Sequence, residues 1–192
     1  PFATSEAGDL YLPEEAIPAA AAAVAGRTFD GVTINTQPPA DPNAARLQPN
    51  DLAGLDLGMT SPRPAGARSM FGLSVCDVGL GRPVILAHPV SELTFRPPTG
   101  ASRIAAEFGL NAAAYAPDAK AVTDGVGIEI AELRANGLRR VLYQRELNPA
   151  TVPADRGPQS VTLDTAGPFD GTLVFRITPG PRDNLVNDWA YW

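Results

Sequence analysis

Oxygen-bearing side chains gather in one short segment, residues 181–188 (PRDNLVND). Carboxylate and amide oxygens, together with backbone carbonyls, are the hard ligands that Ca²⁺ prefers. The segment therefore predicts a calcium ion that holds a loop, with Asp183, Asn187 and Asp188 as ligands. It does not match the EF-hand pattern, so an ordinary Asx-rich turn is the alternative interpretation.

Both tryptophans of the chain lie in residues 188–192 (DWAYW). Flat aromatic faces stack on sugar rings, and neighbouring Asp, Asn and Arg groups can hydrogen-bond the hydroxyls. Strand alternation predicts Trp189 and Tyr191 on one face, in the core, and Trp192 on the other face, at the surface. The predicted carbohydrate-binding residues are Asp183, Asn184, Asp188 and Trp192, faced by Asp124 and Arg103.

The sequence contains few residues that could serve as the base or the thiol nucleophile of a nucleophilic mechanism. His88 is the only histidine and Cys76 the only cysteine, which excludes an internal disulfide and a His-rich metal site. Any Ser–His or Cys–His chemistry must therefore pass through His88, which stands beside Pro89 and is expected to be a structural residue. Residues 72–76 (GLSVC) lack the second glycine of a nucleophile elbow.

Paired carboxylates are the remaining route to an enzyme, since glycoside hydrolysis needs two acids in one cleft. Alternation places Glu107 and Glu129 opposite the apolar residues of their strands, as solubilising charges. We therefore expect a non-catalytic protein, and a sandwich hydrolase would require two facing carboxylates. The acidic residues in or beside expected strands are Glu107, Glu129, Glu132 and Glu146.

The overall composition excludes other classes. A net charge of −6 lacks the positive field that nucleic-acid binding needs, so no nucleic-acid partner is expected. The most apolar stretch, residues 16–26, has about half the roughly 20 residues of a membrane span. The one basic run is interpreted as a solvated strand and turn, or as a contact for an acidic glycan. It comprises Arg134, Arg139, Arg140 and Arg145.

From Phe71 onward the chain has short runs with period-two alternation, as in residues 171–178 (GTLVFRIT), where Leu173, Phe175 and Ile177 share one face. Such runs without long helical patterns predict two packed antiparallel sheets, an all-β sandwich or jelly roll. Residues 1–68 are rich in Pro and Ala and are predicted to be an irregular extension that packs on the sandwich of residues 69–192.

Residues 88–192 resemble a galactose-binding-like jelly roll of the NPCBM group. The resemblance is carried by residues 92–115 (ELTFRPPTGASRIAAEFGLNAAAY), 123–130 (TDGVGIEI), 171–181 (GTLVFRITPGP) and 187–192 (NDWAYW). The histidine usual near the terminal Asp-Trp is absent, and residues 1–68 lie outside the pattern.

The resemblance implies a carbohydrate-binding module in a larger bacterial extracytoplasmic protein, which recognises a cell-envelope or secreted polysaccharide. The alternative is a structural accessory or protein-interaction domain of a membrane-associated glycosyltransferase.

Overall fold

A computed structural model describes residues 41–192 except 59, 120 and 136, together with four two-residue strands in residues 1–40. The chain forms two compact units, residues 1–42 and 43–192. In the first unit β1 (Ala3–Thr4) pairs with β2 (Leu10–Tyr11), and β3 (Thr28–Phe29) pairs with β4 (Val32–Thr33).

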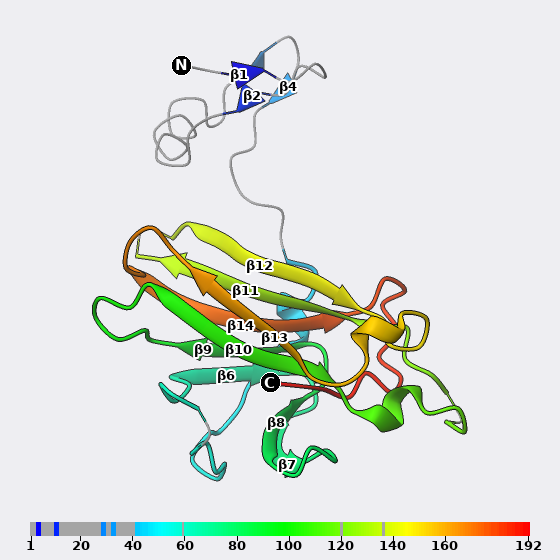
Figure 1. Ribbon diagram of the computed structural model, residues 1–192. Coiled ribbons are helices and arrows are strands. Elements are labelled where there is room, and N and C mark those ends of the chain that lie inside the picture. The colour runs from blue at the N-terminus through cyan, green and yellow to red at the C-terminus, as the bar shows by residue number, and fades with distance from the viewer. Residues whose placement is uncertain are drawn as a thin grey trace. The chain divides into compact units, whose positions relative to one another are not determined.

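The second unit is a sandwich of two antiparallel sheets (Figure 1), so the predicted all-β sandwich is confirmed. The six-stranded sheet has the order β12 (Arg139–Leu147), β11 (Val126–Arg134), β14 (Gly171–Pro179), β9 (Ser91–Phe95), β6 (Gly66–Ser69) and β5 (Gln48–Pro49). The five-stranded sheet has the order β13 (Gln159–Asp164), β10 (Arg103–Leu110), β15 (Ala190–Tyr191), β8 (Pro83–Ala87) and β7 (Leu73–Asp77).

Short 3₁₀ turns complete the unit: η2 (Ala44–Arg46), η3 (Ala112–Tyr115) and η4 (Pro153–Asp155). None of the helical segments among the described residues has the length and apolar character to cross a bilayer.

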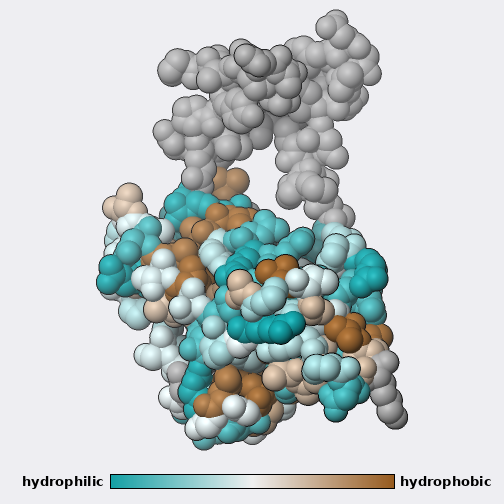
Figure 2. All heavy atoms as spheres, turned by 45° about the vertical axis from the view of Figure 1, so that its right-hand side comes forward, coloured by the Kyte–Doolittle hydropathy of each residue, from teal (hydrophilic) through white to brown (hydrophobic). Residues whose placement is uncertain are grey.

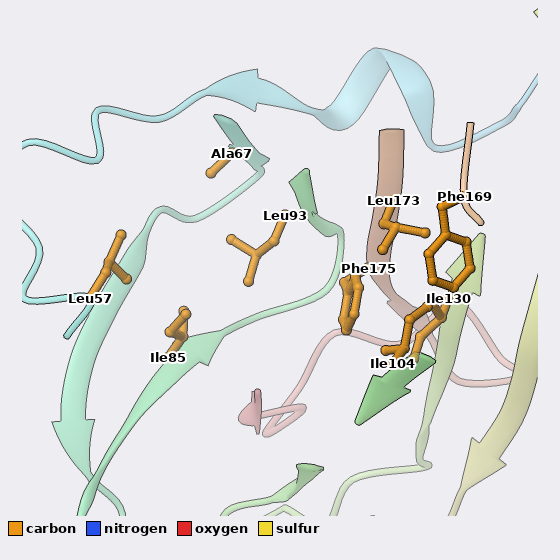
Figure 3. Packing of buried hydrophobic residues seen from close by; sticks show 9 residues of the cluster. All are labelled: Leu57, Ala67, Ile85, Leu93, Ile104, Ile130, Phe169, Leu173 and Phe175. Carbon is orange, nitrogen blue, oxygen red and sulfur yellow. The ribbon is translucent and has the colours of Figure 1, made fainter. Parts of the chain in front are cut away.

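The core lies between the sheets and follows from the alternation of apolar residues. Leu173, Phe175 and Ile177 of β14 are buried, and Ile128 and Ile130 of β11 are fully buried beside them. Figure 3 shows Phe175, Leu173 and Ile130 packed with residues of other strands and loops. Phe95 and Phe175 meet edge to face with their ring centroids 4.9 Å apart.

Residues before position 69 also contribute to the sandwich. β5 and β6 lie within residues 48–69 and pair with each other, and β6 also pairs with β9. Leu47, Leu57 and Ala67 are buried. The prediction that residues 1–68 pack on the sandwich stays a prediction for residues 1–42, because the two units are described separately.

Candidate functional site

The predicted site residues lie at two places in the sandwich. Because β11 and β14 are antiparallel, Val126 lies opposite Pro179 at one end and Leu133 opposite Thr172 at the other. Asp124, two residues before β11, and Asp183, after β14, belong to the first end. Arg103 and Trp192 instead line a cleft between the sheets.

A buried network ties two loops together at the first end. The Thr123 hydroxyl donates to Asp188 Oδ1 at 2.5 Å and accepts the backbone N–H of Gly125 at 2.9 Å. Gly125 has a φ of +106°, and a Cβ there would lie 2.3 Å from the Leu147 carbonyl oxygen. Only glycine fits this turn, so the Thr-Asp-Gly sequence positions the hydroxyl that holds Asp188.

Two carboxylates of this network are almost completely buried. Asp124 is 2% exposed and Asp188 is 0% exposed. Asp124 Oδ2 accepts the backbone N–H of Arg182 at 3.2 Å and its guanidinium Nε–H at 3.3 Å. Asp124 Oδ1 and Asp188 Oδ2 are buried, and neither has a hydrogen-bond partner in the described part of the chain.

Burial disfavours the ionised form of Asp188 and raises its pKa from 3.8 to about 7. The hydrogen bond from Thr123 opposes this shift, and the charge of Asp124 adds to it. The two carboxylates therefore form an electrostatically unfavourable pair that a cation would relieve.

In the structure, the other acidic and amide side chains of residues 181–188 form hydrogen bonds with protein groups. Both carboxylate oxygens of Asp183 accept hydrogen bonds from Arg46, each at 2.6 Å, at the exposed surface. The Asn187 amide donates to the Ala121 carbonyl, and Asn184 Oδ1 accepts the Val186 N–H in an Asx turn. Within the described ranges, no group of three or more His, Cys, Asp and Glu residues could hold a metal ion.

A shallow depression of about 380 Å³ lies on the surface beside this network. We call it the loop depression; its lining is Ala113, Ala116, Asp118, Ala119, Asn187 and Trp189. Trp189 is partly exposed here, whereas the alternation argument placed it in the core. β15 begins only at Ala190, so period-two alternation does not extend to Trp189.

Two backbone hydrogen bonds hold the loop depression. Trp189 C=O accepts the Asn111 N–H at 2.8 Å and joins the two loops, while Ala114 C=O accepts the Thr123 N–H at 3.1 Å within the connection from β10 to β11. Asn111 also caps η3 by accepting the Ala113 N–H at 3.0 Å. The backbone of Trp189 is thus held next to η3, and Asp118 and Asn187 line the same depression as Trp189.

Trp192 packs against core residues of both sheets and stays partly exposed. Its ring meets Phe175 and Phe108 edge to face, with centroids 5.1 and 5.8 Å apart. It lines a cleft of about 420 Å³, which we call the interlayer cleft. Buried Ile85, Leu93 and Phe175 form its inner part.

Charged side chains surround the mouth of the interlayer cleft. Arg82 contacts Glu107, and exposed Arg103 binds Asp164 through bonds of 2.7 and 3.1 Å. Arg103 and Trp192 therefore belong to a different site from Asp124, Asp183, Asn184 and Asp188.

The candidate catalytic residues His88 and Glu132 pack against, or form ion pairs with, neighbouring side chains of the sandwich. His88 lies 5.5 Å from the Phe71 ring, and burial lowers its pKa below 6.5. Glu132 is 1% exposed and binds Arg140 at 2.8 Å and Arg134 at 3.4 Å. Among the described residues, neither the loop depression nor the interlayer cleft is lined by two carboxylates.

Comparisons with known proteins add little. No protein-family model and no curated protein matches the sequence. A solved structure of the CBM51-2 and INT domains of ZmpB from Clostridium perfringens is similar with a TM-score of 0.36 and 11% identity. The match covers 57% of this chain and 22% of that chain, and we infer no function from it.

Proposed function

We propose that this chain is a non-catalytic carbohydrate-binding module whose ligand binds in the loop depression. The observation that supports this function best is that a partly exposed tryptophan, Trp189, lines one depression together with Asp118 and Asn187. An indole face suits the apolar C–H face of a pyranose, while Asp118 can accept and Asn187 can accept or donate hydrogen bonds.

The surroundings favour a small sugar unit over a large apolar partner. Three of the six lining residues are alanines, whose small side chains leave room for one sugar ring beside Trp189. On the face drawn in Figure 2, apolar residues form separate groups between polar ones. The exposed large hydrophobic residues of the described part of the chain are likewise spread over several elements and loops: Met70, Phe71, Val122, Leu133, Val141, Val152 and Val186.

We propose that this module binds a calcium ion at Asp124 and Asp188. Their unpartnered buried oxygens suit a hard divalent cation, which would neutralise both charges. The ion would supply rigidity to the two loops rather than chemistry. Asp183 and Asn187, predicted as further ligands, are engaged by Arg46 and by the Ala121 carbonyl.

The cellular setting is a proposal that rests on the sequence resemblance alone. We place the module in a larger bacterial extracytoplasmic protein that recognises a cell-envelope or secreted polysaccharide.

A glycan array with the purified chain, run with calcium and with a chelator, tests the function. We expect saturable binding that Trp189→Ala weakens at least about tenfold, equivalent to about 1.4 kcal/mol, and that Asp118→Ala also weakens. The matched control is Phe71→Ala, which removes an aromatic ring that is 57% exposed outside the loop depression. Silence across the array, or binding indifferent to Trp189→Ala, would contradict the proposal and favour a structural accessory domain.

A further inference from the structure

The loop depression carries one charged side chain among its described lining residues, that of Asp118. Asp118 is exposed, and its carboxylate forms no hydrogen bond or ion pair with any residue that the structure describes. The other described lining residues are three alanines, Asn187 and Trp189, and none of them is charged. A negative charge in the loop depression is therefore free to bind a ligand.

Asn187 adds a second oxygen acceptor. Its Nδ2 donates to the Ala121 carbonyl, and its φ of +60° lies in the left-handed region, which asparagine tolerates. Its Oδ1 accepts no hydrogen bond from a described residue. The Ala119 N–H is already bound to the Ala116 carbonyl at 3.0 Å. Two side chains therefore present oxygen acceptors to a ligand, and the indole N–H of Trp189 presents a donor.

We propose that the loop depression selects a sugar unit that carries a protonated amino group, such as a hexosamine without its acetyl group. This inference rests on the proposed function and names the class of sugar. An ammonium group donates charge-assisted hydrogen bonds to a carboxylate such as that of Asp118. Among aromatic side chains, tryptophan attracts a cation over its face most strongly. Asp118 and Trp189 thus both favour a cationic sugar.

An anionic sugar fits the loop depression less well, because the charge of Asp118 repels it. The arginines that could attract an acidic glycan are engaged by carboxylates of the sandwich instead. The pairs are Arg134–Glu132, Arg139–Glu129, Arg140–Glu132 and Arg145–Asp155.

A neutral sugar can donate its hydroxyls to the same acceptors, but it lacks the attraction between opposite charges and the cation–π contact. The net charge of −6 also attracts cations to the protein as a whole. A control carboxylate outside the loop depression is therefore needed to separate the two effects.

Three tetrasaccharides with the same β-1,4 linkage test the inference: those of glucosamine, of N-acetylglucosamine and of glucose. Their rings differ only at C2. Calorimetric titrations of the full chain use a mildly acidic buffer, in which the sugar amine is protonated, and about 0.15 M salt, which screens charges beyond about 8 Å. An exposed ion pair and an exposed cation–π contact each contribute a few-fold, so the glucosamine tetramer should bind about tenfold more tightly than either neutral tetramer.

Asp118→Asn should reduce this preference to about threefold, because only the contribution of the indole remains. The affinity for the two neutral tetramers should stay nearly unchanged, since asparagine keeps an oxygen acceptor. The matched control is Glu146→Gln, which removes an exposed carboxylate of β12 outside the loop depression. It should leave the tenfold preference intact.

Equal affinity for the three tetramers would overturn the inference, as would a preference that survives Asp118→Asn in full or falls equally in Glu146→Gln. If the three tetramers bind equally and Trp189→Ala weakens all of them, the proposed function stands and only the choice of the amine is refuted. If none of them binds, the inference is overturned, and the glycan array alone decides the proposed function.

Discussion

Replacing Asp188 by asparagine tests the electrostatics of the buried network around Asp188 and Asp124. The asparagine keeps an oxygen that can accept the Thr123 hydroxyl and removes the buried negative charge. Asp124, bound by Arg182, is the charged group that faces it. The substitution should therefore relieve the repulsion with little change of shape.

The pKa of Asp188 gives the sign and size of the effect. It is 3.8 ordinarily and about 7 in the folded protein. Between these values the folded state binds more protons than the unfolded state, so the free energy of unfolding falls as pH rises. At about 1.36 kcal/mol per pKa unit the full loss is on the order of 4 kcal/mol, complete above the folded pKa.

Urea unfolding of both proteins, from pH 4 to pH 8 in chelator, measures this effect. The variant should be more stable than the parent at pH 8 by up to about 4 kcal/mol, and the difference should shrink steadily toward pH 4. A stability difference that stays constant over this range would refute the reasoning, because it would mean that Asp188 titrates normally in the folded protein.

Three further outcomes are expected. Calcium should raise the Tm of the parent chain and leave that of Asp188→Asn unchanged; an equal rise in both would place the ion elsewhere. Ile128→Ala should cost about 3 kcal/mol in urea unfolding, since Ile128 is 0% exposed, and a cost below about 1 kcal/mol would mean that this part of the core is loosely packed. Glu132→Ala should cost about 3 kcal/mol by leaving Arg140, Arg134 and the Asp170 N–H without their shared acceptor, which thermal unfolding would detect.

The same Glu132 contacts predict a pH response of opposite sign to that of Asp188. Desolvation raises the pKa of Glu132, but the Asp170 N–H, Arg140 and Arg134 outweigh it, so the pKa lies below 4.5. The stability contributed by ionised Glu132 is present at neutral pH and is lost as pH falls through its folded pKa. In Glu132→Ala this acid-range loss should be absent; an unchanged pH profile would contradict the assignment.

Alternation in the sequence was sufficient to predict the sandwich. In β14 the apolar residues at every second position, Leu173, Phe175 and Ile177, do face the core. A strand with one buried face can be recognised from its own residues, because apolar side chains must then recur at every second position. The contributions of β5 and β6 were less visible, since short strands among prolines leave little pattern.

The partners of the predicted site residues could not be predicted, because they are far away in the sequence. Asp183 pairs with Arg46, 137 positions away, and Asp188 bonds Thr123, 65 positions away. Neither partner is marked by local spacing. Trp189 and Trp192 are both partly exposed instead of one in the core and one at the surface, because the alternation argument was applied beyond the two paired residues of β15.

The two tryptophans allow one measurement to test the central proposal. The indole N–H resonances of Trp189 and Trp192, assigned with Trp192→Phe, report separately on the loop depression and the interlayer cleft. We expect titration with a glycan selected on the array to shift the Trp189 resonance in a saturable way and to leave that of Trp192 in place. A shift of Trp192 alone, or of neither resonance at saturating glycan, would contradict carbohydrate binding in the loop depression.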